Sequence, residues 1–212
     1  MCKETILEIG AGKISCEKLS VNLEDDFCVF LDRGYPNDLI DIHNVINDMI
    51  SFNKGIKPNC DKYLISADIF DFMDSFPLKF DRIVANRIFE HMEYMGDKSV
   101  GRLMEACNKL LVPKGILEII VPNAALIAKM ILDLEKIYSA TDIERRTINE
   151  VLIINTENNN IACDPHLSTW SPALAEYYIK QEDTFYIIDI KPKIGYEGRN
   201  IYMKITCQKK NQ

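Results

Sequence analysis

An acid and two glycines near the start of the chain, with a second acid further on, have the types and spacing of a nucleotide-cofactor site. Glu8 lies at the end of an apolar run, and Gly10 and Gly12 follow that run. Because glycine has no side chain and tolerates positive φ, a ligand can approach bare backbone at such a turn. Asp32 follows the next apolar run, where a carboxylate can accept hydrogen bonds from both hydroxyls of a ribose. The plainer interpretations are a solvated strand end for Glu8 and a turn-forming role for Asp32.

The elements that must position these residues follow from the apolar pattern. Short apolar runs alternate with longer segments of helical period, which is typical of βαβ units around a mostly parallel sheet. The connector from Pro192 to Arg199 is too short for a parallel crossover, so the last two runs form an antiparallel hairpin. The expected strands are Thr5–Ile9, Phe27–Leu31, Tyr63–Ala67, Phe80–Ala85, Gly115–Val121, Phe185–Ile190 and Asn200–Gln208.

Three helices are predicted with their start signals. The segments Asn37–Phe52 and Val100–Leu111 each have one apolar face, and Pro113 with Gly115 should stop the second. Ser171 and Pro172 predict the N-cap and first position of the helix before the hairpin. The expected N-caps of the first two helices are Asn37 or Asp38 and Asp97 or Ser99.

Composition narrows the class of protein. The net charge of −7 and the pI near 5.1 argue against a broad surface for phosphate backbones, so we expect no nucleic-acid partner. Seven scattered cysteines without a C-x-x-C pair predict reduced thiols and no zinc site, hence no metal. No secretory h-region or membrane-length apolar run is present, so we expect a cytoplasmic protein without a membrane partner. The 212 residues are compatible with one domain, residues 1–212.

Several of these segments together resemble the class I S-adenosylmethionine-dependent methyltransferases. The resemblance implies a Rossmann-like, seven-stranded, mostly parallel α/β sheet with an antiparallel C-terminal strand and helices on both faces. It implies S-adenosylmethionine as cofactor. Because the Asp/Asn-Pro-Pro-Tyr/Phe run of base-methylating members does not follow the fourth strand, we expect a small-molecule methyl acceptor. The segments that carry the resemblance are Glu8 to Gly12, Asp32, Ala67 to Ile69, Phe80 to Asn86 with Glu90-His91, Leu110 to Glu118, and Asp164 to Pro172.

The resemblance also implies a role for each cofactor-binding residue. Glu8 would bond the methionine ammonium, Gly10 and Gly12 would let the backbone pass the cofactor, and Asp32 would hold the ribose hydroxyls. Asp68 would accept from the adenine amine, where a helix cap is the plainer interpretation. The remaining contacts would come from Ile69 and Arg33 over the ring faces, and from Asn86 or the carbonyl of Ala85 near the amino acid group.

Two histidines are the candidate general bases, which methyl transfer needs only when the acceptor must lose a proton. His91 follows the fourth strand, and its plainer role is a bond to a nearby backbone carbonyl. His166 lies in a turn sequence, where it can also brace Trp170 or cap a helix. Trp170 itself is interpreted as a packing residue rather than a substrate platform.

The segment 124–172 departs most from the family pattern, and insertions there commonly build the acceptor pocket. Its plainer interpretation is an amphipathic helix pair that covers the sheet or forms a homodimer contact. Two alternative functions stay open. One is a non-catalytic protein of the same fold. The other is a nicotinamide-dependent oxidoreductase, although Ser15 stands where its G-x-G-x-x-G/A fingerprint needs a glycine or an alanine.

Overall fold

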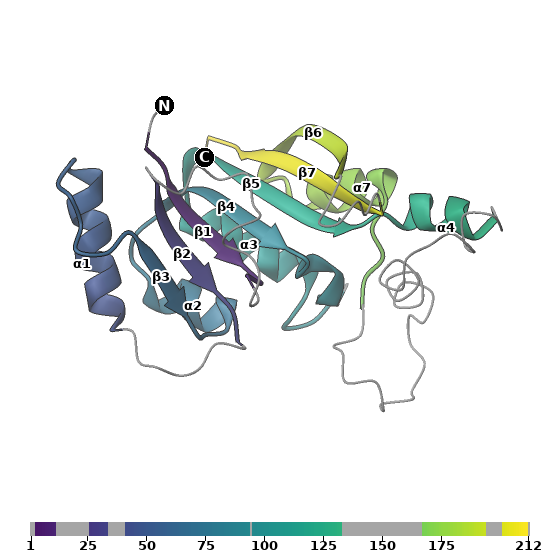
Figure 1. Ribbon diagram of the computed structural model, residues 1–212. Helices are drawn as coiled ribbons and strands as arrows, with labels where there is room; N and C mark the ends of the chain where they lie inside the picture. Colours follow the sequence, from purple (N-terminus) through teal and green to yellow (C-terminus); the bar gives the residue numbers. More distant parts are fainter. Residues whose placement is uncertain are drawn as a thin grey trace.

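A computed structural model describes residues 3–11, 26–33, 41–93, 95–132, 167–193 and 201–211. Its strands form one seven-stranded sheet with the order β3-β2-β1-β4-β5-β7-β6 (Figure 1). The strands are β1 (Thr5–Ile9), β2 (Phe27–Leu31), β3 (Lys62–Ile65), β4 (Phe80–Asn86), β5 (Leu111–Pro122), β6 (Phe185–Lys193) and β7 (Tyr202–Lys209).

The direction of the strands confirms the expected architecture. Strand β1 pairs in parallel with β2 and β4, β2 with β3, and β4 with β5. Strand β7 lies between β5 and β6 and is antiparallel to both. The sheet is therefore mostly parallel with an antiparallel C-terminal strand. The predicted bounds of β1 and β2 agree with the structure residue for residue.

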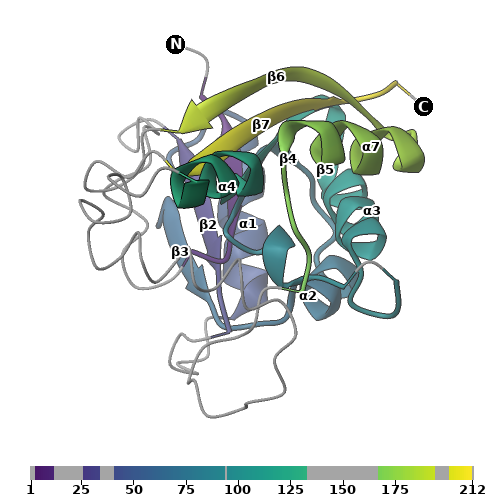
Figure 2. The same ribbon diagram turned by 90° about the vertical axis from the view of Figure 1, so that its right-hand side faces the viewer.

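Helices flank this sheet and join its strands. Figure 2 shows α3 and α7 on the same side of the sheet, and α3 contacts both α2 and α7. The helices are α1 (Ile42–Asn53), α2 (Ile69–Ser75), the 3-10 turn η1 (Phe89–His91), α3 (Val100–Leu110), α4 (Ala124–Leu132) and α7 (Pro172–Glu182).

Side-chain caps start four of these helices. Ser99 caps α3 and Ser171 caps α7 ahead of Pro172, as predicted. The expected caps of α1 were wrong, because Asp41 accepts the hydrogen bond from His43 N–H and the helix begins only at Ile42. The apolar period upstream extended the predicted helix past its actual start. Asp68 caps α2, which confirms its plainer interpretation.

The junction between α3 and β5 differs from the predicted stop at Pro113 and Gly115. The helix ends at Leu110, and β5 begins at once with Leu111 opposite Phe80. The β4–β5 register then shifts between Phe80 and Arg82, and Lys114 has a positive φ of 63°. A local irregularity thus lets the strand include residues that ordinarily break regular structure.

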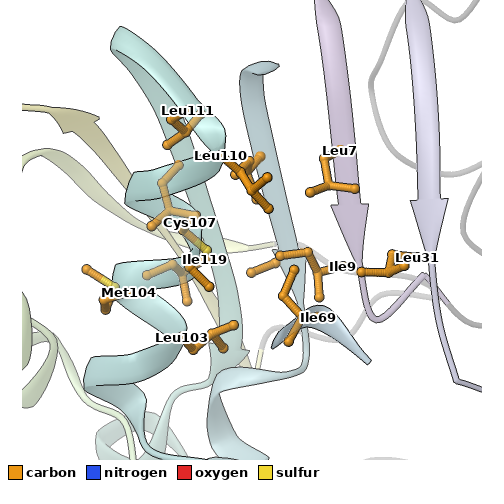
Figure 3. Close-up of a cluster of buried hydrophobic side chains, with 14 of the residues drawn as sticks. Leu7, Ile9, Leu31, Ile69, Leu103, Met104, Cys107, Leu110, Leu111 and Ile119 are labelled. Atoms are coloured by element: carbon orange, nitrogen blue, oxygen red, sulfur yellow. The ribbon is translucent and has the colours of Figure 1, made fainter. Parts of the chain in front are cut away.

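Two apolar clusters lie on opposite faces of the sheet, because successive strand side chains alternate in direction. The larger cluster joins strand residues to buried side chains of α1, α2, α3 and α7. Figure 3 shows Leu103 and Cys107 of α3 directed toward the strands. The smaller cluster contains Ala11 and strand residues alone among the part of the chain that the structure describes: Ile6, Cys28, Phe30, Val84 and Ile120.

The structure also bears on the cysteines, membrane helices and metal ligands considered from composition, within the described ranges only. Cys28, Cys60, Cys107 and Cys207 form no disulfide there. Burial raises the pKa of the Cys207 thiol to about 12. Within the same ranges no helix is long and apolar enough to cross a membrane, and no group of three or more histidine, cysteine or acidic side chains is placed to hold a metal ion.

Candidate cofactor site and active site

The turn after β1 lies where the ends of three strands converge. Backbone N–H groups of Gly10 and Ala11 donate to the Leu31 carbonyl at the end of β2, at 3.0 and 3.4 Å. Gly10 has φ +72°, and a Cβ added there would lie 2.8 Å from the Asn86 carbonyl oxygen at the end of β4. Only glycine satisfies both the left-handed conformation and this close approach. The turn therefore exposes bare backbone between β2 and β4.

Strand register places the first acid beside this turn. Glu8 pairs with Phe30 on one side and Val84 on the other, so it shares the face of the smaller apolar cluster. It is only 1% exposed, which rules out the solvated strand end. Asn86 Nδ2 donates to Glu8 Oε1 at 3.5 Å. Two of the expected cofactor residues are thus in contact at the carboxyl end of the sheet.

The second and third acids lie after β2 and β3. Asp32 is half-buried, and its N–H donates to the Ile65 carbonyl at 3.1 Å, which continues the β2–β3 ladder. By alternation its side chain shares the face of Glu8. Asp68 uses Oδ1 to accept from Phe70 N–H at 2.8 Å and Oδ2 to pair with the Arg33 guanidinium. The Arg33 side chain is 60% exposed.

Two other expected residues contribute to the larger core cluster. Ile69 is 6% exposed, and Figure 3 shows it below the ends of Ile9 and Leu31. Ala85 is fully buried opposite Ile9. The side chains of Ile69 and Ala85 therefore pack in the protein interior. Contacts of Ile69 or the Ala85 carbonyl with a cofactor stay predictions.

The candidate bases are only partly described. His91 is half-buried at the end of η1, and its N–H donates to the Ile88 carbonyl at 3.1 Å. His166 and Gly12 lie outside the described residues, as does the chain from 133 to 166. Whether His91 acts in catalysis stays a prediction.

The segment before α7 packs against the turn after β4. Leu167 and Ser168 N–H groups both donate to the Glu90 carbonyl, at 2.7 and 3.0 Å. The Ser168 hydroxyl donates to the Phe89 carbonyl at 2.8 Å and accepts from Trp170 Nε1–H at 3.0 Å. Trp170 is 1% exposed, with its ring edge-on to Phe89. Trp170 is therefore a packing residue, as predicted.

Sequence reasoning missed Arg87, which directly follows β4. Its φ is +54°, and its N–H donates to the Ile120 carbonyl at 2.8 Å. A left-handed conformation costs a residue with a Cβ on the order of 1–2 kcal/mol. No residue type in the Arg87 to Phe89 run signals that conformation, because glycine and asparagine are its usual markers.

Comparison with known proteins bears on the fold. No protein-family model matches the chain, and no curated protein matches its sequence. Among solved structures, the N-methyltransferase NodS from Bradyrhizobium japonicum is 15% identical with a TM-score of 0.53, and the match covers 98% of this chain and 86% of NodS. The plantazolicin methyltransferase BpumL is 16% identical with a TM-score of 0.58, and the match covers 98% of this chain and 77% of BpumL.

A third solved structure agrees with these two. The Burkholderia thailandensis 1,6-didemethyltoxoflavin-N1-methyltransferase is 11% identical with a TM-score of 0.57, and the match covers 99% of this chain and 72% of that one. The chain has the class I methyltransferase fold. Its strand order places β1 between β2 and β4, so the Gly10 turn lies in the interior of the sheet and not at an edge strand.

Proposed function

We propose that this protein is an S-adenosylmethionine-dependent methyltransferase that acts on a small-molecule acceptor. The observation that carries the proposal is the convergence of β1, β2 and β4 at the Gly10 turn, with Glu8 and Asp32 on one face. Bare backbone between two carboxylates suits a ligand with a sugar and an amino group. BpumL and the Burkholderia enzyme, which share the fold, were crystallised with S-adenosylhomocysteine.

The described residues fit that cofactor by their chemistry. A methionine ammonium needs an acceptor, which Glu8 supplies, and Asn86 beside it offers an amide to the amino acid group. Ribose hydroxyls need an acceptor, which Asp32 supplies. Asp68 already accepts two bonds, and a carboxylate has about four lone-pair sites, so it retains capacity for an adenine amine. Gly10 and Gly12 would let the backbone approach, and Arg33 and Ile69 would flank the ring.

The chain's own residues then align the reactants. When bound, the cofactor supplies a methyl group activated by a positively charged sulfur. Positioning an acceptor in line with such a carbon can account for roughly 7–11 kcal/mol of the barrier. His91 or His166 would accept the acceptor's proton where one must leave, with a pKa near the working pH. The segment 124–172, of which α4 and residues 167–172 are described, would provide walls of the acceptor site.

The size of the acceptor rests on the same fold comparison. The Burkholderia enzyme was crystallised with 1,6-didemethyltoxoflavin, and BpumL with a triazolic analogue of desmethylPZN. These are small or peptide-derived molecules, and the acidic net charge of −7 disfavours nucleic-acid backbones here. We therefore place the acceptor among small amines, hydroxyls and carboxyls.

Calorimetric titration tests the cofactor assignment directly. S-adenosylmethionine and S-adenosylhomocysteine should bind the native chain and raise its Tm, whereas nicotinamide nucleotides should not. Asp32→Ala should weaken S-adenosylhomocysteine binding at least about tenfold, because charge-assisted bonds to the ribose are lost. Asp74→Ala is the matched control, since Asp74 is an exposed acid on α2 that pairs with Lys109. Its affinity should equal that of the native chain.

Three outcomes would redirect the proposal. Unchanged affinity in Asp32→Ala contradicts the ribose assignment. Binding of S-adenosylmethionine without methyl transfer across an acceptor panel indicates a non-catalytic protein of this fold. Binding of NAD or NADP in its place indicates the oxidoreductase. If His91 is the base, His91→Ala keeps the cofactor affinity of the native chain and lowers turnover.

A further inference from the structure

Arg87 has a backbone conformation that its own residue type does not favour. Among the described residues, Arg87, Lys114 and Asp183 are the non-glycine residues with positive φ. Of these, Arg87 is the one that follows β4 at the carboxyl edge of the sheet. Its N–H is held by the Ile120 carbonyl, while the preceding peptide carbonyl, that of Asn86, abuts the Gly10 turn. The strand ladder and the candidate cofactor turn therefore both fix the position of the peptide that precedes Arg87.

The turn alone does not explain an arginine at this point. Glycine or asparagine meets a left-handed requirement with less strain, so the conformation gives no reason for a long cationic side chain. Residues in such sparsely populated conformations persist where the surrounding structure over-determines them, and they cluster at ligand sites. The position thus combines a fixed backbone with a side chain that makes no hydrogen bond or ion pair in the part of the chain that the structure describes.

Within the described ranges, no ion pair balances the charge of Arg87. Among the described arginines, Arg33 pairs with Asp68, Arg82 with Glu4 and Glu118, and Arg102 with Asp97. Arg87 is exposed and is the one described arginine that makes no ion pair. An unpaired guanidinium is notable in a chain of net charge −7, where carboxylates outnumber cations.

Arg87 and His91 both retain solvent access around a buried turn. Between them, Phe89 is fully buried and Glu90 is 2% exposed, so η1 is anchored in the interior. Arg87, two residues before η1, and half-buried His91 at its end therefore flank one anchored turn, and Ile88 beside Arg87 lies 3.5 Å from a Cβ placed on Gly10. An anion anchor and a candidate proton acceptor in this arrangement suit one acceptor molecule.

We propose that Arg87 binds a carboxylate of the methyl acceptor, so that the enzyme acts on a small carboxylic acid bearing the methylated amine or hydroxyl. This inference rests on the proposed methyltransferase function. The planar guanidinium matches a carboxylate in a bidentate pair, which fixes orientation as well as position. A singly charged carboxylate fits better than a phosphate dianion, because Glu8 and Asp32 already make this edge of the sheet acidic.

Paired ligands on defined variants test the inference. The probes are amino- and hydroxy-substituted carboxylic acids of three to ten carbons, each beside its primary amide, titrated by ligand-observed NMR into protein saturated with S-adenosylhomocysteine. For those acids of the series that fit the site, the native chain should bind the acid about 10- to 100-fold more tightly than its primary amide. Arg87→Asn, which tolerates the left-handed backbone, should abolish that preference, and Arg87→Lys should retain part of it.

A matched control separates the site from general charge. Lys114→Asn also removes one positive charge at an exposed residue of positive φ, but Lys114 lies between Leu111 and Ile116, which pair with the start of β4 at the opposite edge of the sheet. Its acid preference should equal that of the native chain.

The remaining outcomes decide against the inference or against the function. An acid preference that survives Arg87→Asn, or no preference in any pair, overturns the acceptor site. Weaker S-adenosylhomocysteine binding in Arg87→Asn overturns it in favour of the cofactor's own carboxylate. If S-adenosylhomocysteine does not bind the native chain at all, the methyltransferase proposal fails. The same acid-to-amide comparison on the native chain and Arg87→Asn would then still decide whether Arg87 forms a carboxylate site.

Discussion

Gly10 shows how one residue type links the sheet to the candidate site. The turn needs a left-handed residue, and the Asn86 carbonyl occupies the place of any Cβ at 2.8 Å. Each requirement excludes most residues, and together they leave glycine. The same absence of a side chain exposes the backbone that a cofactor would approach, so structural and functional demands coincide at this position.

Gly10→Ala separates these two demands when it is compared with Gly55→Ala. The two glycines have almost the same φ, +72° and +73°, but nothing lies within 4 Å of a Cβ at Gly55. Gly55→Ala should therefore cost only the left-handed penalty, about 1–2 kcal/mol. Gly10→Ala should cost more, because β1 and β4 must move apart, and should weaken S-adenosylhomocysteine binding at least about tenfold. Denaturant unfolding and calorimetry measure both effects. Equal losses in the two variants would contradict the close approach.

At the scale of elements, the turn η1 and the segment before α7 form one unit. The Ser168 hydroxyl bridges the Phe89 carbonyl and the Trp170 indole, and Leu167 and Ser168 bond the Glu90 carbonyl. The chain thereby returns to the end of β4 before it enters α7. His91 and the candidate acceptor wall are consequently held at a fixed separation by buried polar bonds.

Ser168→Ala should loosen that unit. Phe89 O keeps a bond from Met92 N–H, but the buried Trp170 N–H would lose its partner, at a cost of about 1–3 kcal/mol. Since the chain contains one tryptophan, its fluorescence reports on this site and should shift to the red in the variant. The variant should also unfold at a lower denaturant concentration than the native chain. Ser75→Ala is the control, because Ser75 donates to the Asp71 carbonyl at an exposed position. A Ser168→Ala chain as stable as the control would rule out the bridge as a stabilising contact.

Elements with a clear hydrophobic period and with capping or turn residues at their ends were predictable from the sequence. The bounds of β1 and β2 follow from dense apolar runs that end at glycine or aspartate, and the serine caps of α3 and α7 follow from local hydrogen bonding. The start of α1 was not, because Asp41 competes with earlier capping residues and only the folded turn decides between them.

The positions of some candidate site residues relative to one another were predictable from residue type and from their place at strand ends. Glu8 and Asn86 were both expected near the amino acid group of the cofactor, and they lie in contact because β1 and β4 are parallel neighbours whose carboxyl ends meet at one edge of the sheet. Arg87 was not predicted, because it is distinguished by its φ angle and by the lack of an ion pair among the described residues. Neither feature can be inferred from the residue type. Outside the candidate site, the role of Asp48 was not predicted, because its partners lie further along the chain, in β3 and the loop before it.

At the scale of the whole molecule, buried and exposed charges contribute unequally. A row of ion pairs connects the residue before β1 with β4, β5 and β7, through Glu4, Arg82, Glu118 and Lys204. Its members are 14–35% exposed, and solvent-accessible pairs typically contribute less than about 1 kcal/mol each. Asp48 on α1 is different, because it is 5% exposed and holds the loop before β3.

Four hydrogen bonds converge on the Asp48 carboxylate. They come from Tyr63 Oη at 2.5 Å, Cys60 N at 3.0 Å, Asn59 Nδ2 at 3.1 Å and Asn59 N at 3.2 Å. The Tyr63 bond, helped by the others against the opposing effect of burial, lowers the pKa of Asp48 below its ordinary 3.8. Burial, followed by the bond to Asp48 and its charge, raises the pKa of Tyr63. The pair is thus stable as carboxylate and neutral phenol.

Asp48→Asn should therefore destabilise the chain in a pH-dependent way. Asparagine replaces one of the two acceptor oxygens by an NH₂ donor, so at neutral pH we expect a loss of about 2–3 kcal/mol in the free energy of unfolding. Because the pKa of Asp48 is lower in the native state, its carboxylate contributes its full stabilisation above the unfolded pKa of about 3.8. This contribution is lost as the pH falls through the native pKa. The difference between native chain and variant should shrink toward acid, as urea unfolding from pH 7 to pH 3 would measure. In the control Asp41→Asn, asparagine still caps α1, so its cost should stay within a few tenths of a kcal/mol. A gap between native chain and Asp48→Asn that stays constant down to pH 3 would show that the carboxylate's charge is not what holds the β3 edge to α1.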